Sequence, residues 1–113
     1  MSTQQVILTT TIIAAGEVTQ QRLVGYDGNT CAKGAKAFGV AEVDGVAGDA
    51  VPLNVAGIIA VEAGAAVSSG DRLQSDEHGC VIPLEATGTP ERVGVAITAA
   101  TGAGSIIRVM WGA

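Results

Sequence analysis

The sequence contains an internal repeat, and this repeat restricts the folds that the chain can adopt. The tripeptide Gly-Val-Ala at residues 39–41 recurs at residues 94–96. After each tripeptide, a glycine precedes three apolar residues at alternate positions. The two series are Gly48, Val51, Leu53 and Val55, and Gly104, Ile107, Val109 and Trp111. Alternation with a period of two is typical of a strand that buries one face. Each half is therefore predicted to end in such a strand.

A second correspondence precedes the first one in each half. The series Arg22-Leu23, Asp27 and Cys31 recurs as Arg72-Leu73, Asp76 and Cys80. Each half thus has a short strand, an Asp/Gly turn, a return strand, a Gly-Val-Ala strand, a Gly turn and an alternating strand. An ordered series of this kind indicates a degenerate duplication. The repeat predicts a pseudo-symmetric β-barrel or β-sandwich.

Composition supports an all-β fold in a single domain of 113 residues. The chain has 19 Ala, 14 Val, 9 Ile and 16 Gly against 5 Leu and three aromatic residues. Val and Ile favour strands, whereas Gly disfavours helix interiors. Turn signals separate the apolar stretches, as in a small barrel or sandwich. The β-branched run Gln5–Ile13 predicts one strand, and Glu62–Ser69 could form at most a single helical turn. We expect short strands and little helix.

Charge and targeting signals limit the partners. The formal net charge is −5 and the sequence pI is about 4.5, which disfavours binding to nucleic acid phosphates. The first 16 residues are uncharged and interrupted by Thr and Gln, so they are expected to be neither a signal peptide nor a membrane span. Cys31 and Cys80 are interpreted as small buried apolar residues of a cytoplasmic protein, although their spacing leaves a disulfide open. The basic residues are scattered singly: Arg22, Lys33, Lys36, Arg72, Arg92 and Arg108.

No catalytic pattern is found in the sequence. His78 is the single histidine and lies in a polar turn, so it is interpreted as a solvated turn residue. Cys31 with His78 would be the only nucleophile and base pair, and no third group is evident to orient it. The order of turn residues and apolar residues from Val67 to Pro83 resembles that of lipoyl or biotinyl carrier barrels. However, no lysine follows Lys36 to carry the group. We expect no enzyme activity, no cofactor and no metal.

Two stretches resemble known phage proteins. Residues 22–30, Arg-Leu-Val-Gly-Tyr-Asp-Gly-Asn-Thr, followed by Ala35, Ala37 and residues 39–41, resemble the core segment of lambda-type bacteriophage head decoration proteins. A longer ordered set of motifs resembles the small phage capsid cement proteins. This set comprises residues 38–41, 47–49, 55–61, 63–67 and 69–71, Asp76, Gly79, and residues 93–96 and 104–109. The two likenesses together span about residues 22 to 111.

The resemblance implies a β-tulip-like barrel and a structural role in the virion. Such a capsid decoration, or cement, protein binds the outer surface of the expanded head as a homotrimer and stabilises contacts between major capsid protein subunits, with no nucleic acid or membrane partner. It is assembled in the host cytoplasm. The implied layout is an N-terminal arm and first strand at residues 1–21 and a decoration domain at 22–113. The capsid-binding arm would comprise Ser2, Thr3, Gln4, Gln5 and Val6.

Some assignments remain open from the sequence. The run up to Ile13 could either add to a capsid sheet by strand addition or be an ordinary first strand of the protein's own sheet. Trp111 and Tyr26 are candidate anchors of either the trimer contact or the core, because large side chains are scarce. The alternative function is a small-ligand or carbohydrate-binding β-module, which the three aromatic residues support poorly.

Overall fold

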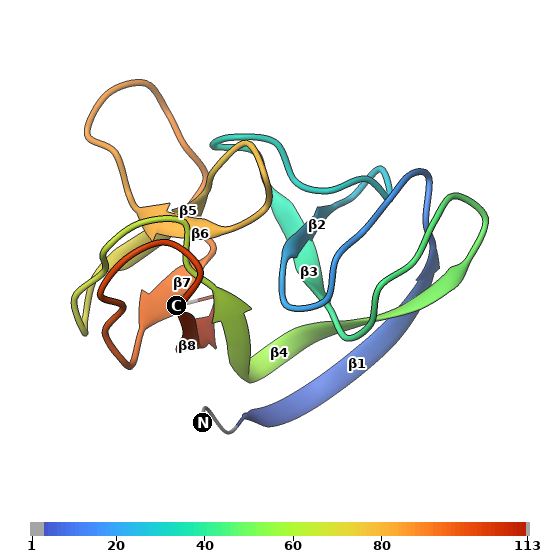
Figure 1. Cartoon of the computed structure of the whole chain (residues 1–113), viewed down its shortest axis with the longest axis horizontal. Helices are drawn as coiled ribbons and strands as arrows, with labels where there is room; N and C mark the ends of the chain where they lie inside the picture. The colour runs from blue at the N-terminus through green and yellow to red at the C-terminus, as the bar shows by residue number, and fades with distance from the viewer. Residues whose placement is uncertain (1–3, 113) are drawn as a thin grey trace.

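The computed structural model describes residues 4–112 and consists of strands joined by turns and loops (Figure 1). Those residues contain no helix, so none is present that could cross a membrane. The sheet forms a nearly closed barrel in a small single domain, as predicted. The strands are β1 (Gln5–Ile13), β2 (Leu23–Gly25), β3 (Ala37–Ala41), β4 (Ala50–Glu62), β5 (Arg72–Ser75), β6 (Val81–Pro83), β7 (Gly94–Ala96) and β8 (Ile106–Trp111).

The long strand β4 organises the sheet. The strand order is β2-β3-β4-β8-β7-β5-β6, and β1 pairs with β4 outside this path. Asn54 pairs with Thr9 of β1 and with Val40 of β3, while Ile58 pairs with Gln5 of β1 and with Met110 of β8. A strand residue has one neighbour on each edge. Therefore β1 lies along one edge of β4, and β3 and β8 share the other edge.

The register of the strand pairs confirms the duplication. Val40 and Ala41 of β3 pair with Asn54 and Leu53, and Val95 and Ala96 of β7 pair with Met110 and Val109 in the same way. The pairing of β1 with the first half of β4 is likewise repeated by the second half of β4 with β8. Ile12↔Val51 and Ile13↔Ala50 correspond to Val61↔Ile107 and Glu62↔Ile106. Thus β4 both ends the first repeat and begins the second.

The turns that follow β2 and β5 align differently from the sequence prediction. Gly28 and Gly79 both have positive φ, at 84° and 77°, and their N–H groups donate to Gly25 and Asp76 carbonyls. The turns therefore match glycine to glycine, and Cys31 does not occupy the position of Cys80. The predicted Asp27–Asp76 correspondence instead reflects a local property, because each aspartate accepts the N–H two residues ahead.

The core has two parts: the smaller lies within the first repeat, and the larger combines side chains of both repeats. The larger cluster contains Leu23, Ile59, Leu73 and Ile107 among its fully buried side chains, and the smaller one contains Val18, Val51 and Leu53. Val and Ala supply most of both clusters, so small side chains suffice where the sheet curves closely on itself. The segment Glu62–Ser69, for which the sequence allows at most a single helical turn, forms none: Glu62 ends β4, and the following residues form bridges and turns.

Candidate docking surfaces

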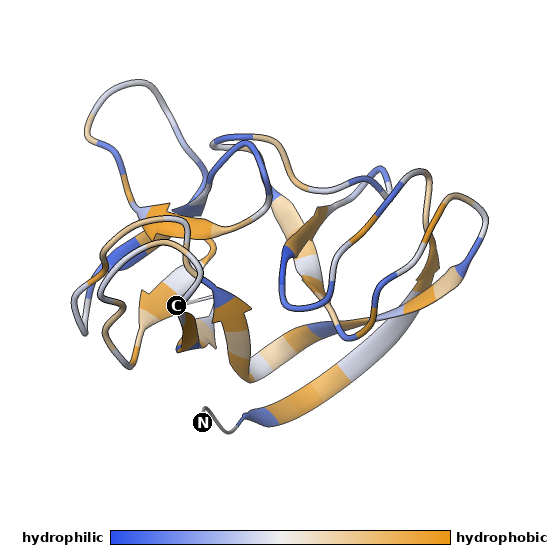
Figure 2. Ribbon diagram, in the orientation of Figure 1, coloured by the Kyte–Doolittle hydropathy of each residue, from blue (hydrophilic) through white to orange (hydrophobic). Residues whose placement is uncertain are grey.

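Strand β1 has a free edge rich in apolar side chains. Within residues 4–112, β4 is the one strand that pairs with β1. Ile7, Leu8 and Ile13 are 81%, 55% and 64% exposed, and Figure 2 shows apolar bands along this strand. Native proteins usually protect long edge strands with charges or proline, whereas no charged residue occurs before Glu17. The edge is therefore suited to pairing with another chain.

A bulge in β1 produces part of this apolar surface. Val6 pairs with Gly57 and Leu8 with Ala56, so Ile7 has no cross-strand partner and is extruded. Gly57 has a φ of 102°, and a Cβ there would collide with the Gln5 carbonyl oxygen. The sequence run predicted the strand with its correct limits but not the bulge, which depends on this close approach to a distant glycine.

A second apolar feature lies at the hairpin after β2. The Tyr26 and Phe38 rings stack with centroids 4.8 Å apart, and the Lys36 ammonium lies 5.8 Å from the centre of the Tyr26 ring. Tyr26 is 64% exposed, so it is not a core anchor. An exposed aromatic ring held by stacking is suited to protein contacts. Trp111 is half-buried and packs against the larger core cluster.

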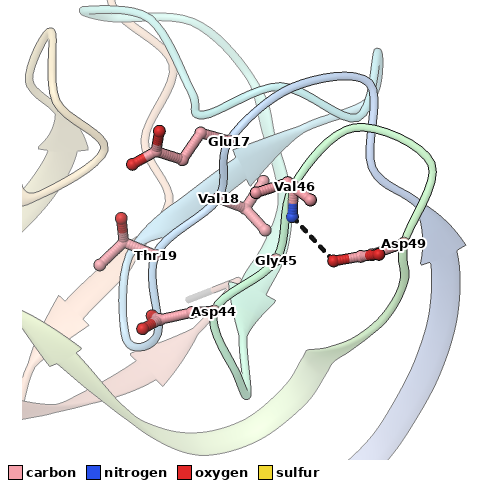
Figure 3. A pocket seen from close by; sticks show the side chains of 7 residues that line it. All are labelled: Glu17, Val18, Thr19, Asp44, Gly45, Val46 and Asp49. Atoms are coloured by element: carbon pink, nitrogen blue, oxygen red, sulfur yellow. Dashed lines mark hydrogen bonds between the residues drawn. The ribbon is translucent and has the colours of Figure 1, made fainter.

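The acidic cleft between the loops after β1 and β3 offers little chemistry. It has a volume of about 340 Å³ and carries the carboxylates of Glu17, Asp44 and Asp49 (Figure 3). Asp44 accepts the Gln20 N–H at 2.7 Å, and Asp49 accepts the Val46 N–H at 2.9 Å. Two of the three carboxylates therefore stabilise turns. Among the described residues, no cluster of three or more metal-ligating side chains occurs.

The thiols lie in the interior of the protein. Cys31 and Cys80 are buried and free, which confirms their interpretation as small buried residues. Burial, with help from Asp76 and Glu62, raises the pKa of Cys80 to about 11. The Arg22 guanidinium lies 3.2 Å from the Glu62 carboxylate, and this hydrogen bond raises the pKa of Arg22. His78 is an exposed turn residue, and its side chain lies 3.8 Å from the Glu77 carboxylate. The Cys31 thiol faces the Ala35 carbonyl, so it is not paired with His78 as a nucleophile would be with its base.

The described arm residues lie next to or at the start of β1. Ser2 and Thr3 lie outside the described residues. Gln4 accepts the Ala60 N–H through its side-chain carbonyl at 3.0 Å, while Gln5 and Val6 pair with Ile58 and Gly57. In the isolated chain the run up to Ile13 is thus the first strand of the protein's own sheet. Ile7, Leu8 and Ile13 were not singled out by the sequence, although the uncharged run through Gly16 signals them.

Comparisons with known proteins agree with the fold. The chain is similar over 93% of both chains to the head fiber gp8.5 N base of bacteriophage phi29, with 24% identity and a TM-score of 0.73. Because the sequence identity is only 24%, this similarity is evidence for the fold alone. No curated protein matches the chain. Residues 1–111 match the phage cement protein family. Because this match covers almost the whole sequence, the chain belongs to the phage cement protein family.

Proposed function

We propose that this protein binds the outer surface of the expanded phage head as a homotrimer and stabilises the contacts between major capsid protein subunits. The proposed role in the virion is structural rather than catalytic. It joins the head after synthesis in the host cytoplasm. The observation that carries the proposal is the uncharged β1 edge with Ile7, Leu8 and Ile13 exposed, in a chain of the cement protein family. Exposed apolar surface of this kind marks a binding site.

The N-terminal segment is the part that we assign to the capsid. Ser2, Thr3, Gln4, Gln5 and Val6 would extend the β1 strand onto a capsid sheet edge, where backbone hydrogen bonds supply affinity without special side chains. The only polar side-chain tie of this segment in the described residues is the Gln4–Ala60 hydrogen bond at 3.0 Å. Residues 22–113 would form the decoration domain that remains folded throughout.

Binding to undecorated expanded heads tests this function. The purified protein is titrated onto the heads, the heads are pelleted, and the bound copies are counted per head. The proposal predicts saturable binding in multiples of three per site. A variant with Gln4→Ala, Gln5→Ala and Val6→Ser should bind more weakly, whereas Val43→Ser, at an exposed apolar residue beyond β3, serves as the matched control. No saturable binding by the wild-type chain contradicts the proposal.

A further inference from the structure

The junction between the two repeats shows how a strand can dock on this fold. The second half of β4 begins the second repeat. One edge of this half-strand pairs with β8, and its other edge contacts the first repeat. The Glu62 N–H donates to the Gln21 carbonyl at 2.8 Å, and the Arg22 guanidinium pairs with the Glu62 carboxylate at 3.2 Å. The loop that precedes β2 is therefore a receptor for a first strand.

Within residues 4–112, the second repeat carries the same loop with no strand paired to it. Gln21 and Gly70 both have positive φ, at 66° and 91°. Their N–H groups donate to equivalent carbonyls, those of Ala41 and Ala96, at 2.8 and 2.7 Å. Gly70 thus corresponds to Gln21. Thr19 and Gln21 are half-buried, whereas their counterparts Ser68 and Gly70 are exposed; Gln20 and its counterpart Ser69 are both exposed. The difference follows from β4, which covers the first loop and has no counterpart on the second.

Strand β1 is the equivalent of the strand that fills the first loop. The register of the sheet places Ile13 of β1 at the position of Glu62 in β4. Ile13 is 64% exposed, whereas the Glu62 side chain is 23% exposed. The N–H groups of alternate strand residues point to the same edge. Because the Ala14 N–H donates back toward Asp49, beside β4, the Ile13 N–H points to the free edge.

No like-charge pair opposes a contact between the two ends. Asp71 takes the place of Arg22, since the carbonyls of both accept the N–H of the Gly-Val-Ala alanine, Ala96 and Ala41 respectively. A glutamate brought beside Asp71 would create a like-charge pair, but β1 offers the neutral Ile13. The whole uncharged run through Gly16 can also approach a second copy of net charge −5 without adding repulsion.

We propose that β1 of one copy docks on the loop Ser68–Asp71 of a second copy, as the second half of β4 docks on the loop before β2. The Ile13 N–H then donates to the Gly70 carbonyl of the neighbouring copy. The two surfaces differ, so the contact is heterologous and generates a ring when the rotation closes. The inference rests on the proposed homotrimer, and names its interface.

Directional cross-linking tests this contact. One batch carries Ile13→Cys and another Ser68→Cys; both keep the buried native thiols. The batches are mixed on expanded heads, treated with a short bismaleimide and analysed by mass spectrometry. The head-to-tail contact predicts cross-links that join one chain of each batch. Thr87→Cys, in the exposed loop after β6, replaces Ser68→Cys in the control and should give at least tenfold fewer such cross-links.

Light scattering measures how many copies associate. Together with the cross-links, it distinguishes a wrong interface from a wrong oligomeric state. Cross-links confined to pairs of Ile13→Cys chains would show a symmetric β1 contact and overturn the proposal. No cross-link, while three copies still assemble, would overturn the interface and leave the homotrimer standing. Single copies on the heads would refute both. As a second readout, Ile13→Glu, which would bring a carboxylate beside Asp71 of the neighbouring copy, should shift assembly toward single copies by at least tenfold, whereas Val43→Glu should not.

Discussion

Two equivalent glycines allow neighbouring strands of the sheet to approach closely. A Cβ at Gly39 would lie 2.8 Å from the Asn54 carbonyl oxygen, and a Cβ at Gly94 would collide with the equivalent Met110 carbonyl oxygen. Neither glycine has a positive φ. They are needed for space rather than for an unusual backbone. This explains why the Gly-Val-Ala tripeptide recurs, and why it was a reliable indicator of the repeat.

Replacing Gly94 by alanine should therefore destabilise the protein. The added methyl group must displace the β8 backbone, so we expect a loss of about 1–3 kcal/mol in the free energy of unfolding. Chemical denaturation measures it. Gly102→Ala is the matched control, because a Cβ there meets no atom within 4 Å. Equal stability of the two variants would contradict the close approach.

The Cys80 thiol should make stability sensitive to alkaline pH. Burial raises its pKa from 9.0 to about 11 in the folded protein. Between these values the folded state keeps a proton that the unfolded state has lost, so stability falls as pH rises. Unfolding free energies of the wild type and Cys80→Ala, measured from pH 8 to about 11, should converge as the pH rises. Parallel curves would contradict the raised pKa.

At the scale of the elements, β1 is held to β4 by a side-chain bond as well as by its ladder. The Thr9 hydroxyl donates to the Asn54 side-chain carbonyl at 2.8 Å, and Asn54 is 3% exposed. The Asn54 amide in turn donates to the Glu42 carboxylate. A chain of bonds thus joins β1, β4 and the end of β3. It fixes the register of a strand whose other edge is free.

Thr9→Val should weaken this attachment without a change in shape. The hydroxyl is lost and a buried acceptor loses its donor, which costs about 1–2 kcal/mol. Thermal or denaturant unfolding measures the loss, and hydrogen exchange of β1 should accelerate. Thr11→Val, on the same face of β1, is the control, because the Thr11 hydroxyl makes no hydrogen bond among the described residues. If both variants unfold alike, the Thr9–Asn54 bond does not hold β1.

The elements differ in how far the sequence could predict them. Gln5–Ile13 was predictable because β-branched residues fill it, and β8 because its alternation is regular. The sequence did not predict that β4 continues through Ala56, Gly57 and Ile58, because a glycine within a run indicates the end of a strand. In the structure Gly57 has a φ of 102° and the strand continues. The hairpins were misaligned since aspartates in turns serve local hydrogen bonds and carry no register information.

At the scale of the whole molecule, the duplication explains the exposed apolar surface. The first strand of the second repeat, the second half of β4, is covered by the loop of the first repeat. Strand β1, at one end, and the Ser68–Asp71 loop, at the other, have no such neighbour within the described residues and remain open. The sequence indicated the repeat, the family and the shortage of large apolar residues. It did not indicate where the open surfaces lie, because exposure depends on which strands have a neighbour.

Cementing also requires that the protein strengthen the head. Anything that binds the assembled lattice and not its separated subunits stabilises the lattice by mass action. Heating DNA-filled expanded heads with and without saturating protein, and recording the temperature at which they release DNA, tests this stabilisation. A cement protein should raise the release temperature of decorated heads, and Ile13→Glu should give a smaller increase. Saturating decoration that leaves the release temperature unchanged would contradict it.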